Sequence, residues 1–92
     1  MISSGKTPAS TNSTDQVKVI SADANKTIDT VHVVNEGSNG GFCVINGIYY
    51  RVAAYAGTPI YLPKQNVPDI FIERDGSSDM AGVYIFATYR GQ

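Results

Sequence analysis

Cys43 and His32 are the single cysteine and the single histidine of the chain, so a thiol–imidazole pair could form only between them. Such a pair works as nucleophile and base when the two side chains are adjacent and the surroundings stabilise the thiolate. Cys43 lies within the apolar segment Phe42-Cys43-Val44-Ile45, and cysteine is among the most frequently buried residue types. We therefore interpret Cys43 as an inert core residue. His32 alternates with its apolar neighbours, so we interpret it as a surface or interface residue.

Four carboxylates gather around one turn near the C-terminus, namely Asp69, Glu73, Asp75 and Asp79. Oxygen ligands at this spacing could hold Ca²⁺, but the segment lacks the length and the bidentate glutamate of an EF-hand loop. A catalytic acid–base pair would need a shaped cleft that shifts its pKa values, and the sequence indicates none. We interpret these residues as turn carboxylates and predict no catalytic residue, no metal site and no cofactor.

Composition narrows the class of protein further. The 92 residues include seven basic and eight acidic ones, and the basic residues are dispersed along the chain, whereas a nucleic-acid-binding domain usually shows a basic cluster. No apolar run has the length of a signal peptide or a membrane helix. We expect a chain that is not exported by the usual route and that binds neither nucleic acid nor membrane. A single cysteine excludes an internal disulfide, so association is the remaining way to stabilise so small a core.

The N-terminal residues 1–14 differ in composition from the rest of the chain. They are rich in Ser and Thr and contain little that could form a core, so their own contacts would not offset the entropy of ordering them. We predict a flexible arm over residues 1–14 that could fold along a partner's surface. We also expect that its deletion leaves the thermal stability of the remaining domain, residues 15–92, nearly unchanged.

From Gln16 onward, β-branched and aromatic residues alternate with turn residues, and no window keeps a helical period for three turns. This pattern predicts an all-β domain, a small antiparallel β-sandwich or barrel of about seven short strands. The expected strands span residues 16–22, 28–35, 41–46, 48–54, 59–62, 69–74 and 82–90. Prolines bracket residues 60–62, so we place that strand at a sheet edge, where a missing N–H does no harm.

The segment FCVINGIYYRV, residues 42–52, predicts a hairpin because Asn46-Gly47 is the preferred pair for a two-residue type I′ turn. On one face, register pairs Ile45 with Ile48, Cys43 with Tyr50 and Gly41 with Val52; on the other, it pairs Val44 with Tyr49 and Phe42 with Arg51. Both faces of the predicted hairpin are thus largely apolar. One face can meet the core, which leaves the other for a partner.

The same surplus of aromatic residues recurs on two other predicted strands. If the aliphatic side of each strand is the core, large side chains remain on the outside, where a sandwich usually places polar residues. Tyr, Phe and Arg are enriched at protein interfaces. We therefore predict an interface set made of Phe42, Tyr49, Arg51, Phe71, Tyr84 and Phe86. A bulge is expected near Thr30, where the apolar parity of Ile28 changes relative to Val31, and a slip of one residue would reverse a face.

Several stretches together resemble one group of known proteins. These are the Ser/Thr-rich start leading into Gln16-Val17-Lys18-Val19, the run NGIYYRVAAYAGTPIYLP, and the segments DIFIERDG and AGVYIFATYR. In the general character of their residues, in their spacing and in size they resemble the small all-β structural proteins of tailed bacteriophage virions, especially capsid decoration (cement) proteins. The resemblance implies non-enzymatic subunits that form dimers or trimers on the outer surface of the capsid and bind over major capsid proteins or another virion protein.

Two alternatives remain open at this level. Tail, neck and head-fibre proteins of phages share the same features, so the position in the virion is not determined. A carbohydrate-binding β-sandwich module would use exposed tyrosines to stack on sugar rings, although the chain has no Trp and its polar loops are short.

Overall fold

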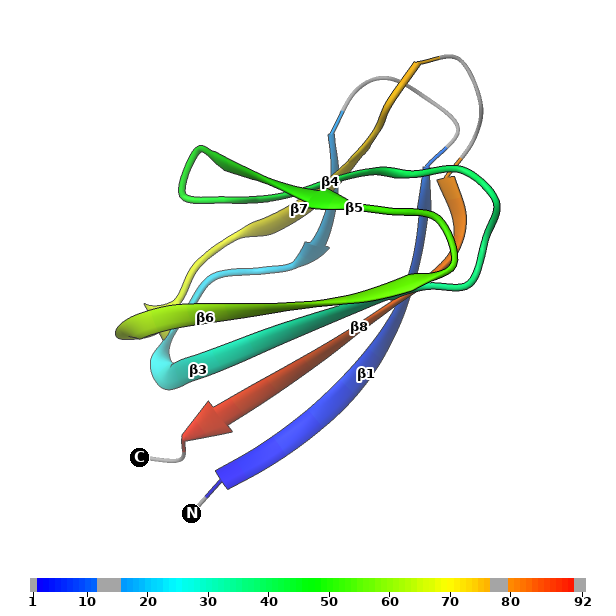
Figure 1. The fold of residues 1–92 in the computed structure, drawn as a ribbon. Coiled ribbons are helices and arrows are strands. Elements are labelled where there is room, and N and C mark those ends of the chain that lie inside the picture. Colours follow the sequence, from blue (N-terminus) through cyan, green and yellow to red (C-terminus); the bar gives the residue numbers. More distant parts are fainter. Residues whose placement is uncertain (1, 12–15, 77–79, 91–92) are drawn as a thin grey trace.

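A computed structural model describes residues 2–11, 16–76 and 80–90 (Figure 1). These residues form eight strands and no helix, and hence contain no helix that could cross a membrane. The strands are β1 (Ile2–Thr11), β2 (Val17–Ile20), β3 (Asp23–Asn35), β4 (Gly41–Ile45), β5 (Ile48–Val52), β6 (Ala56–Val67), β7 (Ile70–Arg74) and β8 (Met80–Arg90). They are arranged as two facing sheets, which confirms the predicted all-β sandwich.

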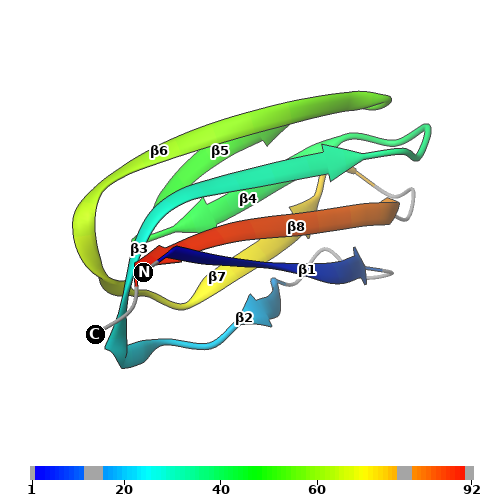
Figure 2. The same cartoon turned by 90° about the horizontal axis from the view of Figure 1, so that it is seen from below.

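Each sheet has four antiparallel strands. Sheet A has the order β1-β8-β3-β6, and sheet B has the order β2-β7-β4-β5; Figure 2 shows the strands of sheet A side by side. The pairs are nested along the chain, β4 with β5, β3 with β6, β2 with β7 and β1 with β8. An eight-stranded double sheet with this order is a jelly roll, an architecture found in viral capsid domains, lectins and cupins.

The flexible arm predicted for residues 1–14 is wrong for the ten residues of β1. Ile2 to Thr11 pair with β8, from Ile2 opposite Arg90 to Thr11 opposite Met80, with a register shift after Ala9. A strand at a sheet edge is held by its backbone hydrogen bonds to one neighbour, so it can form without a strong apolar pattern in its own sequence. Met1 and residues 12–14 lie outside the described residues.

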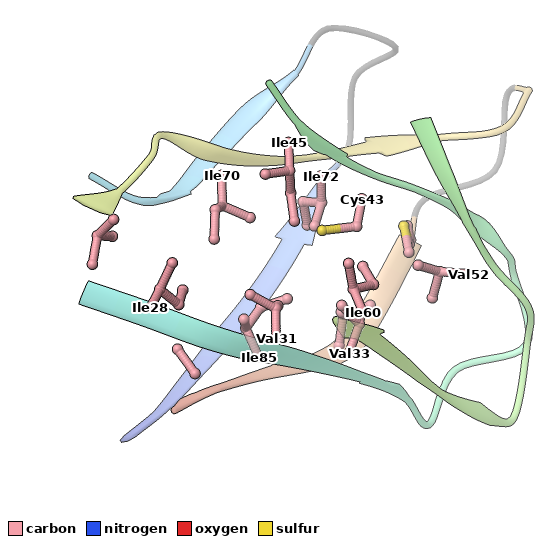
Figure 3. Packing of buried hydrophobic residues seen from close by; sticks show 14 residues of the cluster. Ile28, Val31, Val33, Cys43, Ile45, Val52, Ile60, Ile70, Ile72 and Ile85 are labelled. Atoms are coloured by element: carbon pink, nitrogen blue, oxygen red, sulfur yellow. The ribbon is translucent and has the colours of Figure 1, made fainter. Parts of the chain in front are cut away.

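Aliphatic side chains from both sheets meet between them and form the core (Figure 3). The buried cluster contains Ile28, Val31, Val33, Cys43, Ile45, Val52, Ile60, Val67, Ile70, Ile72, Met80, Val83, Ile85 and Ala87. The predicted bulge is confirmed, because the register of β3 shifts between Ile28 and Thr30 against both of its neighbours. The bulge lets Ile28 and Val31 both point into the core despite their opposite parity.

The predicted hairpin is confirmed pair by pair. Asn46 and Gly47 have φ values of 53° and 78°, as a type I′ turn requires, and all five expected pairs between β4 and β5 are present. Ile48 is 55% exposed although it faces the buried Ile45 across the turn, because β5 is an edge strand. The edge position predicted for residues 60–62 is also confirmed, within the longer strand β6.

One buried polar residue escaped the sequence analysis. Asn35, at the end of β3, is buried. Its Oδ1 accepts a hydrogen bond from the Gly37 N–H at 2.9 Å, and its Nδ2 donates one to the Asn39 carbonyl at 2.9 Å. Because a buried amide needs partners, this residue ties down the loop that carries the chain from sheet A to sheet B.

Candidate functional site: the two outer faces of the sandwich

The six residues predicted as an interface do not form one surface. Phe42, Tyr49, Arg51 and Phe71 lie on β4, β5 and β7, which belong to sheet B, whereas Tyr84 and Phe86 lie on β8 in sheet A. In β4, β7 and β8 these residues alternate with buried ones, and in β5 Tyr49 and Arg51 are paired with the outward Val44 and Phe42. All six therefore point outward, on opposite sides of the sandwich. The sequence identified their outward direction and could not assign them to a sheet.

On the outer face of sheet B, side chains form two cross-strand rows. The first row is Lys18, Phe71, Val44 and Tyr49, and the second is Glu73, Phe42 and Arg51. Val44 points away from the core and is nevertheless only 3% exposed, because aromatic rings flank it on both sides of its row. The rings of Phe42 and Tyr49 meet edge to face, with centroids 5.6 Å apart, the geometry that aromatic pairs favour.

Charged side chains lie over two of the aromatic rings of this face, those of Phe42 and Phe71. The Arg51 guanidinium lies 5.4 Å from the centroid of Phe42 and forms an ion pair with Asp75 at 2.6 Å. At the β2 edge of the same face, the Lys18 ammonium lies 5.8 Å from the centroid of Phe71. Cations above aromatic faces are attracted by the ring quadrupole. The aromatic residues of this face are therefore partly satisfied within the molecule.

Tyr49 is the most exposed ring of this face, at 51%. Its hydroxyl accepts a hydrogen bond from Gln16 Nε2 at 3.1 Å and donates one to Glu73 Oε1 at 3.2 Å. These two bonds hold the ring across the sheet. One side of the ring then borders a hollow of about 450 Å³, which we call the sheet B hollow and which is lined by Gln16, Val44, Asn46, Gly47, Tyr49, Pro68, Asp69 and Phe71.

Asp69 contributes the carboxylate of the sheet B hollow. The Ala22 N–H donates to Asp69 Oδ1 at 2.8 Å, and the Lys18 ammonium lies 3.5 Å from the same oxygen. The backbone hydrogen bond from Ala22 is the main cause that lowers the pKa of Asp69 below its ordinary value. Desolvation opposes it, and the charge and hydrogen bond of Lys18 add to the lowering. The group is therefore an ionised acceptor with a defined position at neutral pH.

The outer face of sheet A has a different composition. Its central rows are Phe86, His32 and Pro59, then Tyr84, Val34 and Gly57, then Thr88, Thr30 and Tyr61. None of these nine positions holds Lys, Arg, Asp or Glu. Phe86 is 36% exposed and Tyr61 is 77% exposed. These nine positions offer a partner aromatic, aliphatic, imidazole and hydroxyl groups. In the neighbouring strand β1, the residue opposite Phe86 is Lys6.

His32 lies across the centre of the sheet A face. Its ring centroid is 6.4 Å from that of Phe86, at an interplanar angle of 47°. A Cβ at Gly57 would come within 2.8 Å of His32 Nε2, so glycine at this position lets the imidazole lie close to the backbone of β6. His32 is exposed, as predicted.

The residues considered for catalysis and metal binding lie apart. Cys43 is buried on the inner side of sheet B, His32 lies outside sheet A, and burial raises the pKa of the Cys43 thiol to about 12. Of the four clustered carboxylates, three have separate partners, Asp69 with Lys18, Glu73 with Tyr49, and Asp75 with Arg51. Asp79 lies outside the described residues. In the described part of the chain, no group of three or more His, Cys, Asp or Glu is placed to hold a metal ion.

Comparison with known proteins does not assign the chain to a group. No model of a known protein family matches it, and no curated protein is similar to it in sequence.

Proposed function

We propose that this protein is a non-enzymatic structural protein of a virus particle, which decorates and stabilises the outer surface of the capsid as an oligomer bound over the major capsid proteins. The observation that carries the proposal is the outer face of sheet A, a broad sheet surface with aromatic residues and without Lys, Arg, Asp or Glu at nine central positions. Exposed apolar patches on small proteins commonly mark interaction sites. The jelly-roll topology agrees with this role, although lectins and cupins share it.

The partner that best fits the sheet A face is a second copy of the same face. Two identical surfaces bring identical charges together across a two-fold axis, and the absence of Lys, Arg, Asp and Glu from the nine central positions limits that repulsion. Aromatic side chains supply the apolar area that the centre of an interface needs. A two-fold dimer through sheet A would bury the exposed parts of Phe86 and Tyr61 in the same contact.

The dimensions of sheet A are sufficient for such a contact. Four strands spaced about 4.8 Å apart, over eight residues at about 3.3 Å each, give a flat area of roughly 500 Å². Two such faces would bury on the order of 1,000 Å², and side-chain relief adds to that area. Specific interfaces start at about 1,200 Å² in total, so the whole face has to take part.

The prolines in the edge strands of sheet A favour contact through its face over contact through its edges. Both edge strands contain proline, Pro8 in β1 and Pro59 and Pro63 in β6. Proline lacks an N–H group, so it interrupts the ladder that an added strand would form, and natural sheets use it to block edge-to-edge association. Face-to-face packing remains available to the same sheet.

Stabilisation of a capsid would then follow from mass action. A protein that binds the assembled shell and not its separated subunits stabilises the shell by RT ln(1 + [L]/Kd) at each site, and the effect is repeated over many sites. This role needs contact area and no catalytic group.

The oligomer is tested by sedimentation of the purified protein across a dilution series, with Phe86→Asp and Tyr49→Asp as a matched pair. We expect a dimer whose Kd rises roughly a hundredfold in Phe86→Asp, because an unpaired carboxylate would be buried in the contact. Tyr49→Asp, on the opposite sheet, should dimerise like the unaltered protein. A monomer at all concentrations, or equal effects of the two variants, would contradict a dimer through sheet A.

The place in the virus particle needs a separate measurement. Antibodies raised against the purified protein should label the outer surface of intact particles, seen by immuno-electron microscopy. Labelling confined to the tail, the neck or head fibres would replace capsid decoration by one of those roles. Absence of the protein from purified particles, measured by mass spectrometry, would overturn the virion proposal.

A further inference from the structure

We propose that the sheet B hollow binds the ring of a neutral sugar, with Tyr49 as the stacking platform and Asp69 as the acceptor for sugar hydroxyl groups. The hollow lies on the opposite side of the sandwich from the sheet A face, so this inference does not depend on the proposed role in a virus particle.

The apolar part of the hollow fits one face of a pyranose. Tyr49 is half exposed there, and Phe71 and Val44 continue the apolar surface beside it. The C–H groups on one face of a pyranose carry partial positive charge, because each carbon is bonded to oxygen, and they are attracted to the negative face of an aromatic ring. The hydrogen bonds of the Tyr49 hydroxyl to Gln16 and Glu73 hold the ring in place before a ligand arrives, which reduces the entropy that binding would cost.

The polar part of the hollow supplies groups that suit sugar hydroxyls. Asp69 presents a carboxylate that is positioned by the Ala22 N–H and by Lys18. Asn46 and Gln16 add side-chain amides, and the Asn46 amide is positioned by donating to Gln65 Oε1 at 3.0 Å. Amides both donate and accept hydrogen bonds, as sugar hydroxyls do. An apolar wall with a few fixed polar groups is the usual composition of a small-molecule site.

Charge and size select the class of sugar. Asp69 is ionised at neutral pH and Glu73 bonds to the platform from beside it, so a carboxylated or sulfated sugar would be repelled by like charge. The volume of about 450 Å³ lies in the lower part of the range of roughly 300–1,000 Å³ typical for ligand sites. Such a volume suits one sugar ring, presented either free or at the end of a chain.

The test is an amide chemical-shift titration of the ¹⁵N-labelled protein with glucose, galactose, mannose and N-acetylglucosamine, and with N-acetylneuraminic acid as the anionic comparison. We expect at least one of the neutral sugars to produce saturable shifts at the amides of Gly47, Tyr49 and Phe71. The anionic sugar should leave these amides unchanged. Absence of saturable shifts with all four neutral sugars, shifts centred on sheet A, or equal binding of the anionic sugar would each overturn the proposal.

Two variants and one control identify the residues. Tyr49→Ala should weaken binding at least roughly tenfold by removing the platform. Tyr61→Ala removes a still more exposed tyrosine from sheet A and should leave the affinity unchanged. Asp69→Asn keeps the shape of the side chain and should weaken binding several-fold by removing the charged acceptor. The ¹⁵N spectrum of each variant reports whether it is folded, and binding retained by both folded variants, Tyr49→Ala and Asp69→Asn, would overturn the assignment.

Discussion

The two outer faces of this sandwich both carry aromatic residues, yet they differ in the charge of the side chains beside those rings. On sheet B, Phe42 and Phe71 lie beneath Arg51 and Lys18, and the ring of Tyr49 is fixed by hydrogen bonds to neighbouring side chains. On sheet A, nine central positions contain no Lys, Arg, Asp or Glu. Outward aromatic residues therefore occur in two settings in this molecule, among charged neighbours on sheet B and among uncharged neighbours in the three central rows of sheet A.

The largest effect is expected from removing the edge strand β1 of sheet A. Deletion of residues 1–11 takes away β1, which pairs with β8 along nearly its whole length. At about 0.5–1.5 kcal/mol for each hydrogen bond, the loss is on the order of 5 kcal/mol, comparable with the whole stability of a small domain. We expect the truncated protein to be unfolded at 25 °C, seen by circular dichroism. A melting temperature within a few degrees of the full chain would show that β1 contributes little and would restore the arm predicted from composition.

A matched pair of valine substitutions measures how tightly the two outer faces are packed. Val44 and Val34 both point outward, but Val44 is buried beneath the aromatic residues of sheet B and Val34 is only half-buried on sheet A. We expect Val44→Ala to lower the free energy of unfolding by about 2 kcal/mol and Val34→Ala by less than about 1 kcal/mol. Urea denaturation would measure both, in the Phe86→Asp background to keep the protein monomeric. Equal losses would mean that the two faces are covered alike.

The smallest expected effect concerns the charges of sheet B. The folded-state pKa of Asp69 is lowered, chiefly by the Ala22 N–H. The stability that the ionised Asp69 adds to the folded protein is therefore fully present above the unfolded-state pKa of about 3.9. It is lost as the pH falls through the lower pKa of the folded state. The unaltered protein should thus lose more stability than Asp69→Asn between pH 6 and pH 2, measured as melting temperature. Parallel pH profiles for the two proteins would show that the Ala22 and Lys18 contacts do not favour the ionised form.

Local features were predictable where neighbouring residues determine them. Asn46-Gly47 selects the turn, and the turn then sets every pair between β4 and β5. The change of parity between Ile28 and Val31 predicts the bulge, because both side chains gain by burial. The strand β1 was missed for the opposite reason, since its Ser- and Thr-rich sequence carries no apolar pattern. Its order comes from pairing with a strand about eighty residues away in the chain.

The candidate sites were also predictable only in their local features. Alternation along each strand placed the six aromatic and arginine residues outside the core, and it could not place them in a sheet. The sheet B hollow combines Gln16, Asn46 and Asp69 from separate segments, and no spacing in the sequence connects them.

The all-β class, the central hairpin and the direction of the side chains along most strands follow from the amino-acid sequence, because these features depend on neighbours within a few residues. The nested pairing of strands, the order of β1 and the division of the aromatic residues between two opposite faces arise in the folded molecule. Those outcomes depend on which distant segments pack together. Pairing across long separations is selected by the free energy of the whole core, to which many residues contribute and which no single segment of the sequence contains.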